Sequence, residues 1–463
     1  MRDFSHTELE NAVIYEVNIR QYSKEGTFKS FEKDLPLLKE LGVRILWFMP
    51  IQPISLTKRK AENLSLIESI EDESQRKRTL GSPYAIADYT AIHPDYGSMQ
   101  DFKQLVSKAH ALGIFVILDW VANHTGWDHK WLSERPEFYH KNQKGEITEP
   151  TDRNGKSLGW NDVAHLNYAH KELRQAMYKQ MEFWLKETDI DGFRCDVADM
   201  VPLDFWEFAV SKLRETKAVF MLAESDHREF LQMAFSVGYD WKIHYLMNEI
   251  AAGRKNVVHL DEAIRWEQEN YSSQTVFMRF TSNHDENAWK GSASERLGEA
   301  EEAFAALTYL LPGLPLIYNG QEYDAQHRLK FFEKDEILKN KGKMFKVYTA
   351  LGKLKNNHPA LNGGFRKATY RRINTSDDKN ILAFVRENKG RQLIYLANLS
   401  AQTRNFTLPL TGAFENYMPG RIHLWNGIEL SFSPWQYWIL SPVDENHAGE
   451  DEAGRFSNQS LEK

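Results

Sequence analysis

Acidic side chains follow four short apolar runs of the sequence. Asp119, Asp196, Glu224 and Asp285 each stand at or just beyond the end of such a run. Clustered carboxylates repel one another, and the repulsion raises at least one pKa, which is useful where a group must carry a proton near neutral pH. Cleavage of a glycosidic bond needs that division, because one carboxylate attacks the anomeric carbon while a protonated one donates to the leaving oxygen. Paired-carboxylate chemistry is therefore the first hypothesis.

The neighbours of two of these residues suggest different roles for them. Arg194 stands two residues before Asp196, so both side chains lie on one side of a strand, and we expect the guanidinium to keep Asp196 ionised as a nucleophile. Glu224 ends the apolar run that starts at Val219, which favours a raised pKa and a general-acid role. The alternative is that Arg194 and Asp196 form an ion pair that only stabilises the fold.

Eight apolar runs alternate with helix-length amphipathic segments over the first 355 residues, a pattern typical of parallel βα units. No Gly-x-Gly-x-x-Gly turn follows any of them, so we predict an α/β fold that is a (β/α)8 TIM barrel, not a doubly wound sheet. Such barrels carry their chemistry at the C-terminal ends of the strands, where these acidic residues stand. The runs are Ala12–Ile19, Val43–Met49, Ile114–Asp119, Ile190–Asp196, Val219–Glu224, Ser236–Tyr239, Thr275–Thr281 and Leu314–Tyr318.

The remaining segments indicate further domains. Residues 123–165 show no sustained period and predict a short inserted subdomain after the third strand, which divides the barrel into residues 1–122 and 166–357. Short β-branched and aromatic runs in residues 358–442 predict a C-terminal antiparallel β-sandwich. These runs are Ile381–Arg386, Gln392–Leu399, Asn405–Leu408, Ile422–Trp425 and Gln436–Leu440. The polar, acidic residues 443–463 are expected to form a disordered tail. The charged stretch 58–78 is expected to be a solvated loop or short helix on the functional rim, where it could edge a cleft.

Composition excludes several classes of partner. The chain has 58 Lys and Arg against 65 Asp and Glu, a net charge of −7, which gives no general attraction to nucleic acid or to an anionic membrane. No apolar run approaches the ~20 residues of a membrane span. The single cysteine, Cys195, excludes an intrachain disulfide. With no apolar signal at its start, the chain is expected to be cytoplasmic, although a trimmed secreted chain would look the same.

Six motifs, in order and at the expected strand ends, resemble those of the α-amylase family of glycoside hydrolases, family 13. The resemblance covers nearly the whole chain and identifies it as a member of that family. Four of the motifs contain the acidic residues described above, and two flank them. They are Asp119–His124, Gly192–Asp196, Ala223–Glu224 and Phe280–Asp285, with Ser82–Tyr89 and Gly313–Glu322 as the flanking pair.

The resemblance implies an α-amylase-type glycosidase that cleaves α-1,4-glucosidic bonds of starch-type glucans or maltooligosaccharides with retention. It makes Asp196 the nucleophile, Glu224 the general acid and base, and Asp285 the residue that grips sugar hydroxyls as the ring distorts. The first two carboxyl groups of a retaining enzyme are ~5–5.5 Å apart, which neighbouring barrel strands can supply. The implied substrate-binding residues are Tyr84, stacked beneath the ring, and His124, Arg194 and His284 around it.

Three alternatives to retaining hydrolysis by two carboxylates are considered. A 4-α-glucanotransferase would use the same carboxylates, with a sugar hydroxyl in place of water, and the loops that decide between them have no predictable shape. A non-catalytic carbohydrate-binding barrel would be expected to lack one of the three acidic residues, and all three are present. Metal-dependent hydrolysis lacks support, since no His-x-x-x-His pair in a helical context stands near a suitable carboxylate.

The sequence departs from the family pattern where some members bind calcium. Asp199 and Met200 stand where a basic residue and a histidine are usual, and His165 stands where aspartate is common. Of the expected ligands only Asn123 is present, and calcium needs ~6–8 oxygen ligands. We expect no cofactor for the chemistry and no tight calcium site of that kind, although oxygens from Asp128, Asp152 and Asp162 are available.

Overall fold

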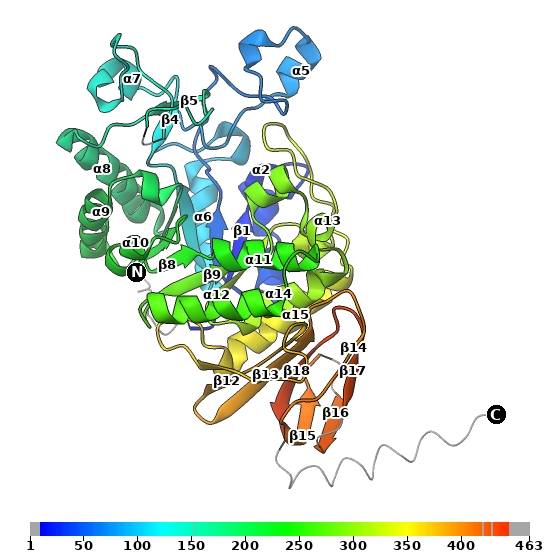
Figure 1. The fold of residues 1–463 in the computed structure, drawn as a ribbon. Coiled ribbons are helices and arrows are strands. Elements are labelled where there is room, and N and C mark those ends of the chain that lie inside the picture. The colour runs from blue at the N-terminus through cyan, green and yellow to red at the C-terminus, as the bar shows by residue number, and fades with distance from the viewer. Residues whose placement is uncertain (1–9, 153, 419–420, 427–428, 444–463) are drawn as a thin grey trace.

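A computed structural model describes residues 10–443 apart from residues 153, 419–420 and 427–428. Eight parallel strands close into a barrel in the order β1-β10-β9-β8-β7-β6-β3-β2 (Figure 1). This confirms the predicted (β/α)8 fold, and each strand lies within or overlaps one of the eight predicted runs. The strands are β1 (Val13–Val17), β2 (Val43–Phe48), β3 (Phe115–Trp120), β6 (Gly192–Cys195), β7 (Phe220–Ala223), β8 (Val237–Tyr239), β9 (Val276–Arg279) and β10 (Leu314–Tyr318).

The barrel strands are buried and largely apolar on both faces because helices cover the outside and side chains fill the inside. Ile14, Trp47 and Leu222 belong to an inner cluster, whereas the alternate residues Val13 and Leu46 pack in the large outer cluster beneath the helices. Burial on both faces is the reason why these strands read as continuous apolar runs.

The helices of the described residues follow the predicted alternation with the strands. The amphipathic segment of residues 30–41 forms parts of two helices, because Pro36 has no backbone N–H to donate and is suited to the first turn of the second one. Asp240 caps the helix that begins at Trp241 by accepting from the Ile243 N–H. None of these helices combines the length and the apolar character that crossing a membrane requires. The α-helices are α2 (Ile19–Tyr22), α3 (Phe28–Glu32), α4 (Leu35–Glu40), α5 (Glu73–Arg78), α6 (Met99–Ala111), α7 (Trp131–Glu134), α8 (Lys171–Thr188), α9 (Leu203–Thr216), α10 (Arg228–Met233), α11 (Trp241–Ala251), α12 (Val257–Asn270), α13 (Ala293–Leu297), α14 (Glu301–Leu310) and α15 (Lys343–Asn357).

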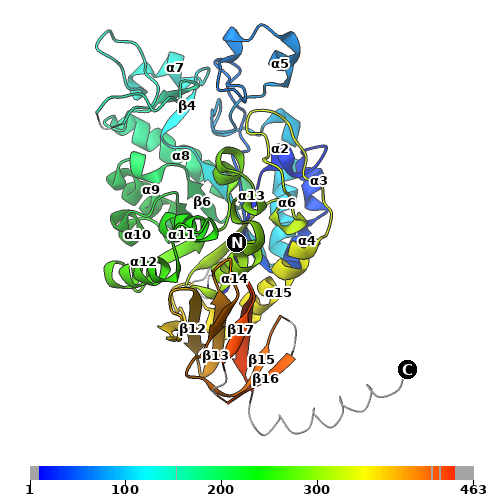
Figure 2. The ribbon, with the colours of Figure 1, turned by 45° about the vertical axis from the view of Figure 1, so that its right-hand side comes forward.

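Two lobes stand on the C-terminal rim of the barrel, one around α7 and one around α5 (Figures 1 and 2). The first lobe contains the antiparallel pair β4 (His124–Gly126) and β5 (Val163–His165), and it falls within the predicted insertion. The second lobe lies in the charged stretch 58–78, whose last part forms α5. Short 3-10 helices and one π-helix, η5, lie in the connecting segments. They are η1 (Ile67–Ser69), η2 (Pro94–Tyr96), η3 (Pro136–Phe138), η4 (Ala198–Met200), η5 (Glu286–Lys290), η6 (Gly298–Ala300), η7 (Gln321–Tyr323) and η8 (Pro359–Leu361).

The C-terminal part is antiparallel, as predicted, and lies at the opposite end of the barrel (Figure 2). A six-stranded sheet runs β11-β12-β13-β18-β15-β16, and a separate pair, β14-β17, packs on it through Phe406 and Phe432, which join Ile394 and Leu396 in one apolar cluster. Residues 444–463 of the expected tail lie outside the described residues. The strands are β11 (Thr369–Arg372), β12 (Ile381–Asn388), β13 (Arg391–Asn398), β14 (Arg404–Phe406), β15 (Thr411–Asn416), β16 (Arg421–Asn426), β17 (Leu430–Phe432) and β18 (Tyr437–Pro442).

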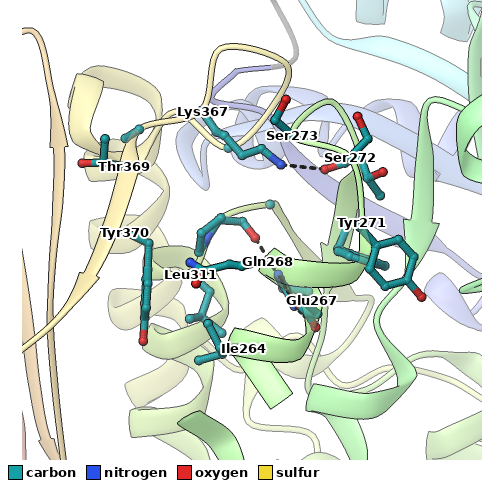
Figure 3. A pocket seen from close by; sticks show the side chains of 17 residues that line it. Ile264, Glu267, Gln268, Tyr271, Ser272, Ser273, Leu311, Lys367, Thr369 and Tyr370 are labelled. Atoms are coloured by element: carbon teal, nitrogen blue, oxygen red, sulfur yellow. Dashed lines mark hydrogen bonds and ion pairs between the residues drawn. The ribbon is translucent and has the colours of Figure 1, made fainter. Parts of the chain in front are cut away.

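A cavity of about 330 Å³ lies where the barrel meets this C-terminal sheet (Figure 3). Lys367 crosses it and donates to the backbone oxygen of Thr275 at 2.7 Å. Thr275 and Gly313 precede β9 and β10, so the cavity is at the N-terminal end of the barrel, away from the strand-end carboxylates. That end of such barrels contributes to stability, and the cavity is a junction between domains.

Candidate active site

The guanidinium of Arg194, at the end of β6, holds three carboxylates from neighbouring strands. Its Nη1 is 2.9 Å from an oxygen of Asp119 and 2.9 Å from an oxygen of Asp196. Its Nη2 is 2.8 Å from Glu224, an ion-pair contact without hydrogen-bond geometry. Nε donates to the hydroxyl of Tyr239 at 3.1 Å. Arg194 is fully buried, so this one cation joins the ends of β3, β6 and β7.

The backbone fixes the relation between Asp196 and Glu224. A Cβ on Gly192 would lie 1.9 Å from the carbonyl oxygen of Phe220, so only glycine allows β6 and β7 this close an approach. The Glu224 N–H donates to the oxygen of Cys195 at 3.0 Å. Val197 has a φ of +36°, a strained conformation for a β-branched residue, and its N–H donates to Glu224 Oε2 at 2.8 Å. Strain at this position aims a backbone donor at the Glu224 carboxylate.

Burial shifts the pKa values of the Asp196 and Glu224 carboxyl groups away from their values in water. It raises the pKa of Asp196 to about 6 and, with a smaller opposing effect of Arg194, raises the pKa of Glu224 to about 7. Arg194 lowers the pKa of Asp196, as the sequence suggested, but burial has the larger effect. The expectation of a raised pKa for Glu224 agrees with the structure.

A second chain of charges runs from Asp285 to β1. His284 Nε2 is 3.3 Å from an oxygen of Asp285, and its Nδ1 contacts the buried carboxyl of Glu16. Burial lowers the pKa of His284, but the charges of Asp285 and Glu16 together raise it well above its ordinary value. Burial raises the pKa of Asp285, but the charge of His284 and its hydrogen bond, together with smaller effects of Arg194 and Trp289, lower this pKa by more, to a net value below the ordinary one. Asp285 is therefore held ionised beside an imidazolium.

Sequence reasoning missed Glu16, which completes this chain. Glu16 is fully buried, one residue before the end of β1, between Tyr15 and Val17. An acidic residue inside an otherwise apolar barrel strand was the available signal, because such a residue is almost never buried without a partner.

Aromatic rings line the site beside these charges. The ring of Tyr84 is stacked on His284 with centroids 5.3 Å apart and on Phe331 at 6.2 Å, and its hydroxyl donates to Asp119 at 3.0 Å. Trp289, on the π-helix η5, donates to Asp285 at 3.1 Å. These rings form a wall next to the carboxylates.

A cavity of about 540 Å³ brings nearly all of the predicted site residues together. Arg194 lies beneath it and holds the carboxylates from below. Burial lowers the pKa of His124 to about 3, so this ring is neutral. Further residues that were not predicted also line the cavity, because they come from loops or, for Trp289, from the short π-helix η5, which leave no sequence period. They are Lys60, Trp160, Trp289, Phe331 and Phe332. The predicted residues that line it are Tyr84, His124, Asp196, Glu224, His284 and Asp285.

The three aspartates of the insert that were considered as oxygen donors for calcium have other partners in the structure. Asp162 is 3.2 Å from the ammonium of Lys60, Asp128 accepts from the N–H of Leu56, and Asp152 accepts from two backbone N–H groups in its own turn. Among residues 10–443, where described, no three His, Cys, Asp or Glu side chains are arranged to hold a metal ion. The absence of a tight calcium site stays a prediction from the sequence.

The barrel and its cluster of strand-end carboxylates define the class, and the chain belongs to the α-amylase family. The family model for the α-amylase catalytic domain matches residues 2–378. Alpha-amylase 3 of Dictyoglomus thermophilum is 27% identical over 67% of this chain, and a maltosyltransferase of Cereibacter sphaeroides that acts between α-1,4-glucan and maltose 1-phosphate is 26% identical over 92%. This chain spans 64% of each of these relatives.

Solved structures of the family superpose closely on this fold. The maltogenic α-amylase AmyB of Thermotoga neapolitana is 27% identical, with a TM-score of 0.82 over 94% of this chain and all of that one. An α-amylase of Lactobacillus plantarum is 30% identical, with a TM-score of 0.81 over the same shares.

Proposed function

We propose that this protein is a retaining glycoside hydrolase of α-1,4-glucans or maltooligosaccharides. The observation that carries the proposal is the placing of Asp196 and Glu224 on one buried guanidinium, in one cavity, with pKa values raised to about 6 and about 7. Near neutral pH this arrangement favours an ionised Asp196 and a protonated Glu224. Those are the protonation states that the first step of retaining hydrolysis needs.

The reaction follows in two displacements. Asp196 attacks the anomeric carbon while Glu224 gives its proton to the glycosidic oxygen, so the C–O bond breaks and a glycosyl ester forms on Asp196. Glu224, now ionised, takes a proton from water, whose oxygen attacks the anomeric carbon and releases Asp196. Arg194 stabilises whichever of the two carboxylates is charged, and the Val197 N–H donates to Glu224 when it is ionised.

The other predicted residues are proposed to bind the sugar ring under attack. Asp285 is held ionised by His284, so it can accept hydrogen bonds from ring hydroxyls. The neutral His124 can both donate and accept, and the ring of Tyr84 offers an apolar face to the sugar.

The proposal is tested first by the lengths of the products from maltoheptaose. A hydrolase releases only shorter chains, and no turnover of any α-glucan would refute the proposal. A 4-α-glucanotransferase is the second candidate, favoured by the likeness to maltosyltransferases, and it would also make chains longer than the substrate.

The roles of the carboxylates are tested by substitution. We expect Asp196→Ala and Glu224→Gln each to lower turnover by orders of magnitude. Glu73→Gln, at an exposed site on α5, is the matched control and should change nothing. If both active-site variants lose their folded state to a similar extent, the Arg194 cluster is structural instead.

A further inference from the structure

The segment of residues 54–81, here called the strap, connects two walls of the active-site cavity. On one side it contacts the inserted subdomain. Lys60 Nζ donates to the backbone oxygen of Gly159 at 2.6 Å and is 3.2 Å from Asp162. Lys58 lies over the ring of Trp127, 3.5 Å from its centroid. Lys60 is only 7% exposed and lines the cavity, so Gly159 and Asp162, and not water, position its charge.

On its other side the strap contacts the loop that follows β10. The N–H of Phe332 donates to Glu62 at 2.6 Å, and the N–H groups of Leu80 and Gly81 donate to the oxygen of Phe332 at 2.8 and 3.1 Å. Phe332 and the adjacent Phe331 line the same cavity. Glu62 and the far end of the strap, at Leu80 and Gly81, are thus bonded to Phe332, which follows the wall residue Phe331.

The barrel order shows which end of the substrate the strap faces. Glu224 follows β7, and as the proposed acid it lies beside the leaving group. The strap leaves β2 and bonds to the loop after β10, and β1, which lies between these two strands, is opposite β7 in the ring of eight. The sugar residues on the non-reducing side of the broken bond therefore extend toward the strap.

We propose that the strap, fastened by Lys60 and Glu62, closes the cavity on its non-reducing side, so that the enzyme cleaves near free non-reducing chain ends. This inference rests on the proposed function and specifies its substrate. The cavity of about 540 Å³ lies within the ~300–1,000 Å³ of sites that enclose one small ligand, and it suits a few sugar rings better than the interior of a polymer. Lys60 and Glu62 are specificity-determining residues.

The test compares two substrates on the whole chain. One is maltoheptaose. The other, called the blocked substrate, is maltoheptaose with O4 and O6 of its non-reducing ring bridged by an ethylidene group. We expect kcat/KM for the blocked substrate to be lower by about tenfold or more, because an added group must enter a closed pocket. Equal values would overturn the inference, and absence of turnover of free maltoheptaose would instead refute the proposed function.

Variants of the strap test whether the strap causes the difference in kcat/KM between the two substrates. Glu62→Ala should raise the blocked-to-free ratio severalfold, because Glu62 is exposed and its loss removes one of the three hydrogen bonds that join the strap to Phe332. The double variant Lys60→Met with Asp162→Asn removes both buried charges together and should raise the ratio further. Lys77→Ala, on α5 and paired with Glu73 on the surface, is the matched control and should leave the ratio unchanged. A ratio unchanged in Glu62→Ala and in a folded double variant, as judged by thermal unfolding, would contradict the inference.

Discussion

The pH dependence of hydrolysis is the most direct consequence of the buried carboxylates. If the free enzyme needs Asp196 ionised and Glu224 protonated, kcat/KM rises with the ionisation of Asp196 and falls with that of Glu224. With pKa values raised to about 6 and about 7, the profile is a bell with its maximum near pH 6.5. Ordinary values of 3.8 and 4.5 would instead place the maximum near pH 4.

The width of the bell follows from the same values. A difference of one pKa unit corresponds to about 1.4 kcal/mol, so the productive form, with the proton on Glu224, outnumbers the form with the proton on Asp196 by about ten to one. About three fifths of the enzyme is then productive at the maximum, and kcat/KM falls to about one sixth of its maximum near pH 5 and near pH 8.

The assay measures initial rates on maltoheptaose from pH 4 to 9.5, with the thermal unfolding temperature recorded at each pH. Glu224→Gln separates the two limbs when the substrate is α-maltosyl fluoride, whose leaving group needs no proton. Its first-turnover fluoride release should keep the acid limb, set by Asp196, and lose the alkaline one. A wild-type maximum below pH 5, or an alkaline limb that persists in Glu224→Gln, would refute the reasoning.

Four further outcomes follow from the same contacts. Because folding raises the pKa of Asp196 from 3.8 to about 6, its contribution favours the folded state below pH 3.8 and is lost as the pH rises through 6. Asp196→Asn should therefore raise the free energy of unfolding at pH 7.5, by at most about 3 kcal/mol, and a lower unfolding temperature would contradict this. Gly192→Ala places a Cβ against the oxygen of Phe220, and we expect a loss of more than about 3 kcal/mol in urea denaturation or no folded protein, whereas a wild-type midpoint would show that the strands can separate. Glu16→Gln should lower kcat/KM by about tenfold through the loss of one charged partner of His284, with an unfolding temperature near that of the wild type as the control. Exhaustive chelation should leave activity and unfolding temperature unchanged, and a loss restored by calcium would reverse our interpretation of the donor set.

The sequence predicted the barrel because its strands are buried on both faces and stand out as apolar runs. It did not predict β11, β15 and β17, whose exposed and buried residues alternate over a few positions. An apolar run can be recognised from its own residues, whereas a half-exposed strand is specified by the strands that pair with it.

The acidic residues of the site were predictable for a related reason, since strand ends can be located along the chain. The partners of these residues were not. Lys60 and Asp162 are about a hundred residues apart, and Asp162 was considered only as a source of oxygens for calcium. Glu62 meets Phe332 across a still longer separation. Contacts between two loops of irregular shape leave no period in either segment.

The balance of buried charge accounts for the proton on Glu224. Five carboxyl groups, those of Glu16, Asp119, Asp196, Glu224 and Asp285, are gathered around two cations, Arg194 and His284. Ionising all five would leave three negative charges uncompensated in a buried site, so the cluster retains protons near neutral pH. His284 holds Asp285 ionised and its pKa low, and Arg194 is shared among the three carboxylates that remain beside it. Between the two groups at the cavity, the pKa of Glu224, about 7, exceeds that of Asp196, about 6, so the last proton of this pair stays on Glu224. The same shortage of cations that weakens the fold at neutral pH thus supplies the acid for the reaction.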